Sequence, residues 1–113
     1  MLYAIIGSRS FSDYTFFKEM LDFSFYTISS IISGGARGAD ELAARYAAEK
    51  DIPIREILPE YKVYGKKAPL VRNIEIINKA EAVIAFWDMI SKGTGSAIKM
   101  AKKRGIPVYI IEV

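Results

Sequence analysis

The sequence predicts a three-layer, doubly wound α/β fold with a five-stranded parallel sheet. Apolar runs alternate with segments of helical period, in the order β-α-β-α-β-α-β-α-β. The predicted strands are apolar on nearly every residue, which is typical of strands that helices cover on both faces. The chain has no Asn-Gly or Asp-Gly hairpin turn, and this disfavours antiparallel pairing.

Three strands and two helices are predicted in the first half of the chain. Leu2–Ile6 is a continuous apolar run that ends at a glycine, so we expect a buried strand there. Asp13–Phe23 has its large apolar residues on one side at helix spacing. Thr27–Ile32 is rich in β-branched residues and predicts the second strand, and an amphipathic helix follows over Ala39–Lys50. Ile52–Leu58 predicts a shorter third strand.

The second half begins with a long, basic and aromatic connection, Pro59–Pro69, and two helix–strand pairs follow it. Leu70–Lys79 carries an apolar stripe and predicts a short helix. Ala82–Trp87 is apolar throughout and predicts a buried strand. Ser96–Arg104 predicts a helix that a following glycine and proline end, and Val108–Val113 predicts the last strand.

We expect a single domain over residues 1–113, because the chain is short and shows no linker, repeat or low-complexity segment. Right-handed crossovers leave few strand orders, of which we favour 3-2-1-4-5 over the flavodoxin-like order 2-1-3-4-5. In the favoured order the switch point lies between the first and fourth strands. Open α/β sheets bind ligands at the carboxyl ends of their strands at such a point, so we expect the functional site there.

The composition excludes several kinds of site. The chain has no Cys and no His, which rules out a Ser-His-Asp triad, Cys nucleophiles, disulfides and Cys/His metal centres. Acid–base chemistry would have to come from Asp, Glu, Lys or Tyr. The net charge is +3, from 16 basic and 13 acidic residues. This charge suits an anionic ligand but is too small to indicate nucleic acid by itself.

We expect a cytoplasmic protein that does not span a membrane. The absence of Cys fits a reducing compartment. The opening residues, Met1–Ile6, lack the basic segment of a signal peptide. No apolar run approaches the ~20 residues that a transmembrane helix needs.

Three loops at the predicted carboxyl edge are rich in Gly and Ser, and each precedes a helix. They are Gly7–Asp13, Ser33–Asp40 and Trp87–Ser96, and each contains one basic residue. Helix N-termini offer unpaired N–H groups, glycines allow close approach, and arginine adds charge-assisted hydrogen bonds. Tight strand-to-helix turns also need Gly and Ser for their own geometry, but three such loops at one edge favour a phosphate-binding pocket.

The predicted site combines these loops with the start of the helix that follows the basic connection. Its ligand-binding residues are predicted to be Gly7, Ser8, Arg9, Gly34, Gly35, Arg37, Gly38, Asp40, Arg72, Asn73, Gly93, Thr94, Gly95 and Ser96. Arg72 would reach a phosphate, whereas Asn73 would read a base or ribose, or would only cap its helix. We predict no metal site built by the protein, and Mg²⁺ is considered only as a companion of a bound nucleotide.

Standard nucleotide-binding fingerprints do not match the chain. No segment reads Gly-x-x-x-x-Gly-Lys-Ser/Thr. The dinucleotide pattern Gly-x-Gly-x-x-Gly is met only by Ser33–Gly38, with Ser in its first place. We therefore do not predict a nicotinamide-dependent dehydrogenase.

Four side chains near the predicted edge have competing roles. Asp13 is expected to cap a helix. Asp40 lies at a helix start, where it would bind a ribose hydroxyl or the N–H groups of its own loop. Asp88 directly follows a buried strand and is the best candidate for a catalytic carboxylate. Trp87 would stack on a base or belong to the core.

The loop motifs, taken together, resemble a known family. They are Gly7-Ser8-Arg9, Gly34–Asp40, Tyr64-Gly65-Lys66, Arg72-Asn73, Phe86-Trp87-Asp88 and Ser91–Gly95. In this order they resemble the YspA/YpsA-related branch of the SLOG superfamily, which groups the DprA (SMF) and Lonely Guy proteins on a Rossmann-like fold. The resemblance covers nearly the whole chain. It implies a nucleotide or nucleotide-derived ligand held by the glycine loops and, since relatives often dimerise, a homodimer.

Three functions stay open at this point. The first is a sensor or carrier module that binds a nucleotide, such as a mononucleotide or an ADP-ribose-type ligand. The second is a nucleotide N-glycosidase or phosphoribohydrolase, as in Lonely Guy enzymes, whose Pro-Gly-Gly-x-Gly-Thr motif precedes a catalytic Glu. Here Gly93-Thr94 aligns with that motif but no Glu follows, so Asp88 would have to serve. The third is a nucleic-acid-binding module of the DprA type, which the low net charge supports poorly.

Overall fold

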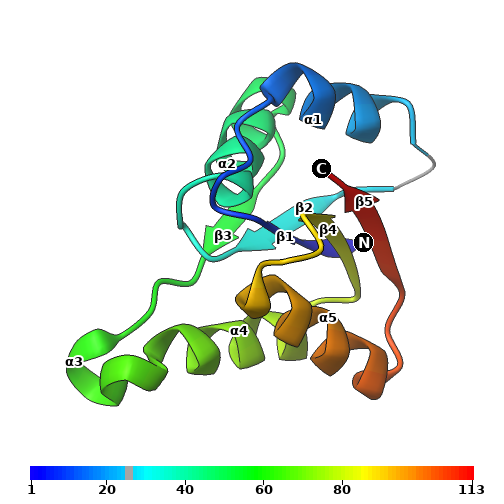
Figure 1. Cartoon of the computed structure of the whole chain (residues 1–113). Helices are drawn as coiled ribbons and strands as arrows, with labels where there is room; N and C mark the ends of the chain where they lie inside the picture. Colours follow the sequence, from blue (N-terminus) through cyan, green and yellow to red (C-terminus); the bar gives the residue numbers. More distant parts are fainter. Residues whose placement is uncertain (25–26) are drawn as a thin grey trace.

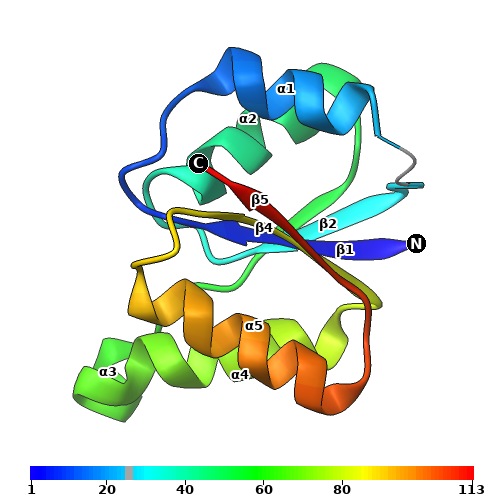
Figure 2. The same cartoon turned by 45° about the vertical axis from the view of Figure 1, so that its right-hand side comes forward.

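The computed structural model describes residues 1–24 and 27–113. Along the chain the elements are β1 (Leu2–Gly7), α1 (Tyr14–Asp22), β2 (Ser30–Ser33), α2 (Ala39–Lys50), β3 (Ile54–Glu56), α3 (Tyr61–Tyr64), the 3₁₀ helix η1 (Gly65–Lys67), α4 (Ala68–Lys79), β4 (Ala82–Trp87), α5 (Lys92–Arg104) and β5 (Val108–Glu112). Helices α1 and α2 cover one face of the sheet (Figure 1). Helices α4 and α5 cover the other face (Figure 2).

The sheet of the described chain has five parallel strands in the order β3-β2-β1-β4-β5. The predicted α/β class and the favoured strand order are confirmed, and the flavodoxin-like order is wrong. Strand β1 pairs with β2 on one side and with β4 on the other. The switch point therefore lies between β1 and β4, and the arrangement is Rossmann-like.

Two strands are shorter than the sequence predicts by two residues or more, and the last strand, β5, ends one residue early, at Glu112. Strand β2 begins at Ser30, so the predicted start at Thr27 is wrong. Strand β3 spans three residues rather than the predicted Ile52–Leu58. It is an edge strand that pairs only with β2, between Ile31↔Ile54 and Ser33↔Glu56. Beyond β3 the contact with β2 continues by one hydrogen bond at each end, from the Ile31 N–H to the Pro53 carbonyl and from the Ile57 N–H to the Ser33 carbonyl, both at 2.9 Å.

Two helical regions begin earlier than predicted. The segment Pro59–Pro69 is not an open connection, because it holds α3 and η1 and the first residues of α4. Pro69 lies in the first turn of α4, where a missing N–H costs no helical hydrogen bond. Helix α5 begins at Lys92 rather than Ser96, so Gly93–Gly95 form its first turn. Within the described residues, no helix is both long enough and apolar enough to cross a bilayer.

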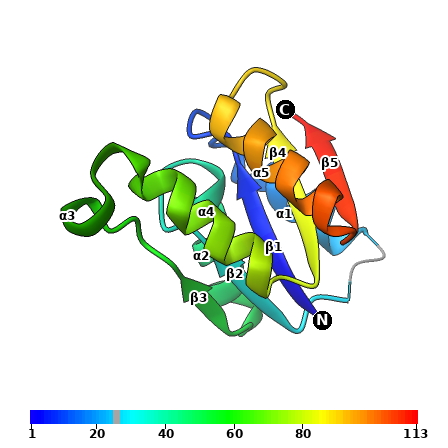
Figure 3. The same ribbon diagram turned by 90° about the horizontal axis from the view of Figure 1, so that it is seen from below.

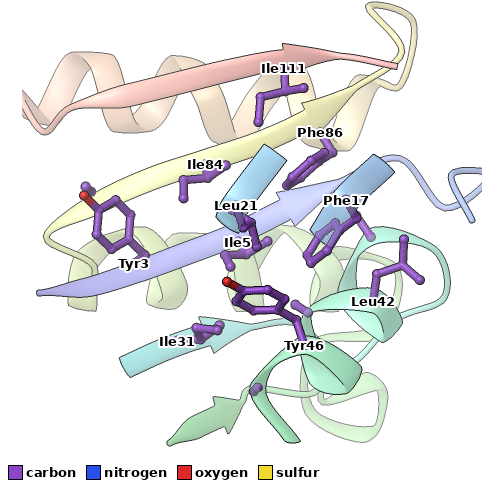
Figure 4. Close-up of a cluster of buried hydrophobic side chains, with 14 residues drawn as sticks. Tyr3, Ile5, Phe17, Leu21, Ile31, Leu42, Tyr46, Ile84, Phe86 and Ile111 are labelled. Atoms are coloured by element: carbon purple, nitrogen blue, oxygen red, sulfur yellow. The ribbon is translucent and has the colours of Figure 1, made fainter. Parts of the chain in front are cut away.

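The two faces of the sheet carry separate cores, because successive strand residues point to opposite faces. Ile5 packs in the α1/α2 layer, whereas Ala4 and Ile6 pack in the α4/α5 layer. The α1/α2 layer holds most of the buried aromatic rings (Figure 4). There Phe17 of α1 stacks on Phe86 of β4, with 4.5 Å between ring centroids. This contact fixes α1 directly over the sheet.

Replacing Phe17 by alanine should strongly destabilise the fold. Phe17 is fully buried, so Phe17→Ala should lower the free energy of unfolding by about 3–5 kcal/mol, from lost burial and a residual cavity. Phe23→Ala, at the end of the same helix, is the control: Phe23 is 85% exposed, and the change should stay within about 0.5 kcal/mol. Urea unfolding of the three proteins measures both. Equal losses would contradict the packing of α1.

Candidate functional site

The loops after β1 and β2 and the first turn of α5 meet at the carboxyl edge of the sheet. Figure 3 shows the end of β1 and the start of α5 at the same end of the molecule. A cleft of about 370 Å³ opens there on the α4/α5 side. Its floor is apolar and is formed by Ile6, Ile76 and Ala97. The predicted site residues that line it are Gly7, Arg9, Gly34, Asp40, Arg72, Asn73, Gly93 and Thr94.

A second cleft of about 230 Å³, here called the side cleft, adjoins the first, here called the main cleft. Of the remaining predicted residues, Gly35 and Arg37 line this side cleft. Its outer wall is formed by Pro59 and by Tyr61 of α3. The loop after β2 and the start of α3 therefore face each other across it.

Ser8 holds the loops together rather than lining either cleft. It is 1% exposed, and its backbone N–H donates to the Phe86 carbonyl at 3.0 Å. Its Oγ accepts a hydrogen bond from the backbone N–H of Asp88, also at 3.0 Å. Its carbonyl accepts from the Ala39 N–H at the start of α2. One buried serine thus connects the ends of β1 and β4 with the first turn of α2.

Gly38 is required by this close approach. It adopts φ +75°, and a Cβ at this position would collide with the carbonyl oxygens of Ser8 and Arg9. A side chain is excluded by conformation and by space together. The prediction that Gly38 contacts ligand therefore stays untested, while its structural role is evident.

Arg72 is the buried cation of the main cleft. It is 8% exposed, and its Nη1 donates to the Gly34 carbonyl at 2.6 Å while its Nε donates to Asn73 Oδ1 at 2.8 Å. Burial lowers the pKa of Arg72, and the nearby Asp40 carboxylate opposes this shift. In the described part of the chain its Nη2 has no hydrogen-bond partner. The guanidinium is therefore held in place with donors left over for a ligand.

Asp40 is the carboxylate that lines the main cleft. It is 9% exposed, and its Oδ2 accepts a hydrogen bond from the Ala36 N–H at 3.1 Å. Burial raises the pKa of this carboxyl, and the Ala36 hydrogen bond and the charge of Arg72 partly offset the effect. Its other oxygen, Oδ1, accepts no hydrogen bond from the described residues.

The residues in the first turn of α5 have different surroundings: Gly93 and Thr94 line the main cleft, whereas Gly95 packs against a side chain. Gly93 is exposed and has no heavy atom within 4 Å of a Cβ placed on it, so it leaves the cleft mouth open. Thr94 is buried at the cleft wall. Gly95 instead faces the Trp87 ring, where a Cβ would lie 3.0 Å from Cζ2. Trp87 packs in the α4/α5 core, and Ser96 lines neither cleft.

The Asp88 carboxylate is used to build a turn. Its Oδ1 accepts from the backbone N–H groups of Ser91 and Ile90, at 2.7 and 2.9 Å, and its Oδ2 accepts from the Ser91 hydroxyl. The N–H groups of Ser91 and Ile90 hold its pKa at about 2, so it is ionised at neutral pH. Asp88 lines neither cleft. Its predicted catalytic role stays a prediction, and its hydrogen bonds identify a structural one.

Several lining residues were missed by the sequence analysis. The main cleft also contains Ser10 and Ser91, and Pro69 forms part of its wall. Pro69 falls within the predicted connection Pro59–Pro69, although a proline followed by an apolar stripe is a helix-start signal. The floor residues are apolar like those of the buried core, and residue type alone does not distinguish a core position from the floor of a cleft. Among the described residues no three acidic side chains are grouped as a metal site would require.

Comparison with known proteins agrees with this architecture. A family model described as "YspA, cpYpsA-related SLOG family" matches residues 3–64, which include the loops after β1 and β2. The chain is similar to the Gene 61 protein of Mycobacterium phage D29, with 38% identity over 84 residues that cover 69% of this chain and 67% of the phage protein. No solved structure matches the chain.

The low pKa of Asp88 predicts a specific pH dependence. Because its pKa is about 2 in the fold against 3.8 ordinarily, the ionised form stabilises the fold above pH 3.8, and this contribution is lost as the pH falls towards 2. The stability difference between wild type and Asp88→Asn should therefore be largest at neutral pH and shrink across this range. Urea unfolding at a series of pH values measures it.

Asp51→Asn is the matched control for this series, because it removes a carboxylate from the end of α2 rather than from the Asp88 turn. A difference between wild type and Asp88→Asn that is independent of pH would contradict the role assigned to the charged carboxylate.

Proposed function

The chain belongs to the YspA, cpYpsA-related SLOG family, and on this basis we propose that it binds a nucleotide or nucleotide-derived ligand in the main cleft. The cleft is small and is lined by the loops after β1 and β2 and by residues of α4 and α5, which suits a small molecule better than a nucleic-acid strand. The net charge of +3 also falls short of the basic surface that strand binding requires. The proposed role is that of a sensor or carrier module.

The observation that carries this proposal is the buried Arg72. A guanidinium is costly to bury, and here two protein acceptors fix it while part of its donor set remains unused. Arg9 lines the same cleft, and so do Gly93 and Thr94 in the first turn of α5, where backbone N–H groups have no acceptor within the helix. Together these groups would hold a phosphate by charge-assisted hydrogen bonds.

The rest of the main cleft fits the sugar and base of such a ligand. The Asp40 carboxylate would accept a hydrogen bond from a ribose hydroxyl, and the neighbouring positive charge of Arg72 would offset its repulsion of the phosphate. The apolar floor of Ile6, Ile76 and Ala97 would receive the flat face of a base. Any Mg²⁺ would be carried by the phosphate groups, because a single carboxylate lines the cleft within the described chain.

Loss of the arginines should weaken nucleotide binding. Removing a charged hydrogen-bond donor costs about 1.5–3 kcal/mol, so Arg72→Met and Arg9→Met should each raise Kd about tenfold to a hundredfold. Isothermal titration calorimetry against a panel of nucleoside mono- and diphosphates measures this. Arg9→Met serves as the second variant because Arg9 is exposed and its loss leaves the packing intact.

Arg55→Met is the matched control, since Arg55 is exposed on the edge strand β3 and lines neither cleft. It should bind as the wild type does. Failure of every nucleotide to bind wild-type protein at millimolar concentration would overturn the proposed function.

A hydrolytic activity is the second candidate, and the position of Asp40 is what favours it. Asp40 lies in the main cleft, and burial raises its pKa, which is the direction that suits a general acid, whereas Asp88 is ionised and engaged in a turn. We expect binding without turnover, so chromatography of nucleoside monophosphates incubated with the protein should show no free base. Base release that Asp40→Asn abolishes and Asp88→Asn preserves would assign a hydrolase to Asp40 instead.

A further inference from the structure

The two clefts at the carboxyl edge adjoin each other. Arg9, Gly34, Ala36 and Arg72 line both of them, so the glycine loop after β2 separates the clefts without closing either. The main cleft of about 370 Å³ suffices for one nucleoside with its phosphate. The side cleft adds about 230 Å³ on the other side of the shared arginines.

Three guanidinium groups surround the junction of the clefts. Arg9 and Arg72 line both clefts and Arg37 lines the side cleft. In the described structure none of the three forms an ion pair with a carboxylate. The carboxylates nearby are Asp40 in the main cleft, Glu56, which lies against Gly35, and Glu41, whose Oε1 accepts a hydrogen bond from the Gly38 N–H. A single phosphate at Arg72 would leave Arg37 without an anionic partner.

The far wall of the side cleft is suited to a second group of the ligand. Tyr61 is 57% exposed, and together with Pro59 it forms a flat apolar wall opposite the glycine loop. Such a wall stacks on a sugar ring or a planar ring more readily than it contacts a free phosphate. The side cleft therefore has a cationic end at the junction and an aromatic end at α3.

We propose that the ligand spans both clefts and is a pyrophosphate-linked nucleotide conjugate: a nucleoside in the main cleft, two phosphates at the three arginines, and a second sugar or ring against Tyr61. The proposal rests on the proposed function, because it assigns the nucleoside end to the main cleft. It adds that the ligand carries two linked phosphates and a second sugar or ring, whereas the proposed function would also be met by a mononucleotide.

The experiment compares matched ligand pairs that share a base, namely AMP with ADP-ribose and UMP with UDP-glucose, by isothermal titration calorimetry. In at least one pair the conjugate should bind about tenfold or more tightly than the monophosphate, because a second phosphate gains charged hydrogen bonds from Arg37. In Arg37→Met and in Tyr61→Ala the ratio of the two affinities should fall towards one.

Tyr64→Ala and Arg55→Met are the matched controls, since both residues are exposed and line neither cleft. They should preserve the ratio. Monophosphates that bind as tightly as their conjugates would overturn the two-cleft proposal and leave the nucleotide-binding function standing. If no member of either pair binds, both proposals fail. A ratio that survives Arg37→Met and Tyr61→Ala would also overturn the use of the side cleft.

Discussion

The site depends on the close approach of three chain segments at one buried serine. Ser8, which follows β1, uses its N–H, its hydroxyl and its carbonyl to bond Phe86 and Asp88 at the end of β4 and Ala39 at the start of α2. Buried polar groups are costly without partners, so this arrangement is stable only when all three segments are in position. The absence of a side chain at Gly38 provides the space that it needs. Cleft geometry is thus a product of the fold's own hydrogen bonds.

Opposite charges lie close together in the main cleft without neutralising each other directly. Arg72 and Asp40 influence each other's pKa, yet they form no ion pair within the described structure. Each is instead held by backbone groups, Arg72 by the Gly34 carbonyl and Asp40 by the Ala36 N–H. A direct salt bridge would satisfy both groups and leave little for a ligand. Separate anchoring keeps a cation and an anion available on the same wall.

The sequence predicts the fold better than it predicts the roles of individual glycines. Helix α2 and strand β4 agree with their predicted bounds, because one has strict apolar periodicity and the other is apolar throughout. The predicted start of α5 is too late because glycine is a poor helix former, and Gly93 and Gly95 therefore read as loop residues. In the structure, tertiary contacts outweigh this low helix propensity in the first turn. Likewise, the sequence predicts a loop at Gly95, whereas in the structure the missing side chain of Gly95 leaves space for the Trp87 ring. Such contacts join residues distant in the chain, and periodicity does not reveal them.

The aromatic core and the clefts lie on different sides of the sheet. Phe17, Phe86 and Tyr46 pack between the sheet and α1 and α2, whereas the cleft floor belongs to the α4/α5 side. Changes in the first layer alter the stability of the domain, whereas changes in the exposed polar lining of the clefts, such as Arg9, alter what it recognises. Ligand specificity can therefore change during the evolution of such a domain while its thermal stability is retained.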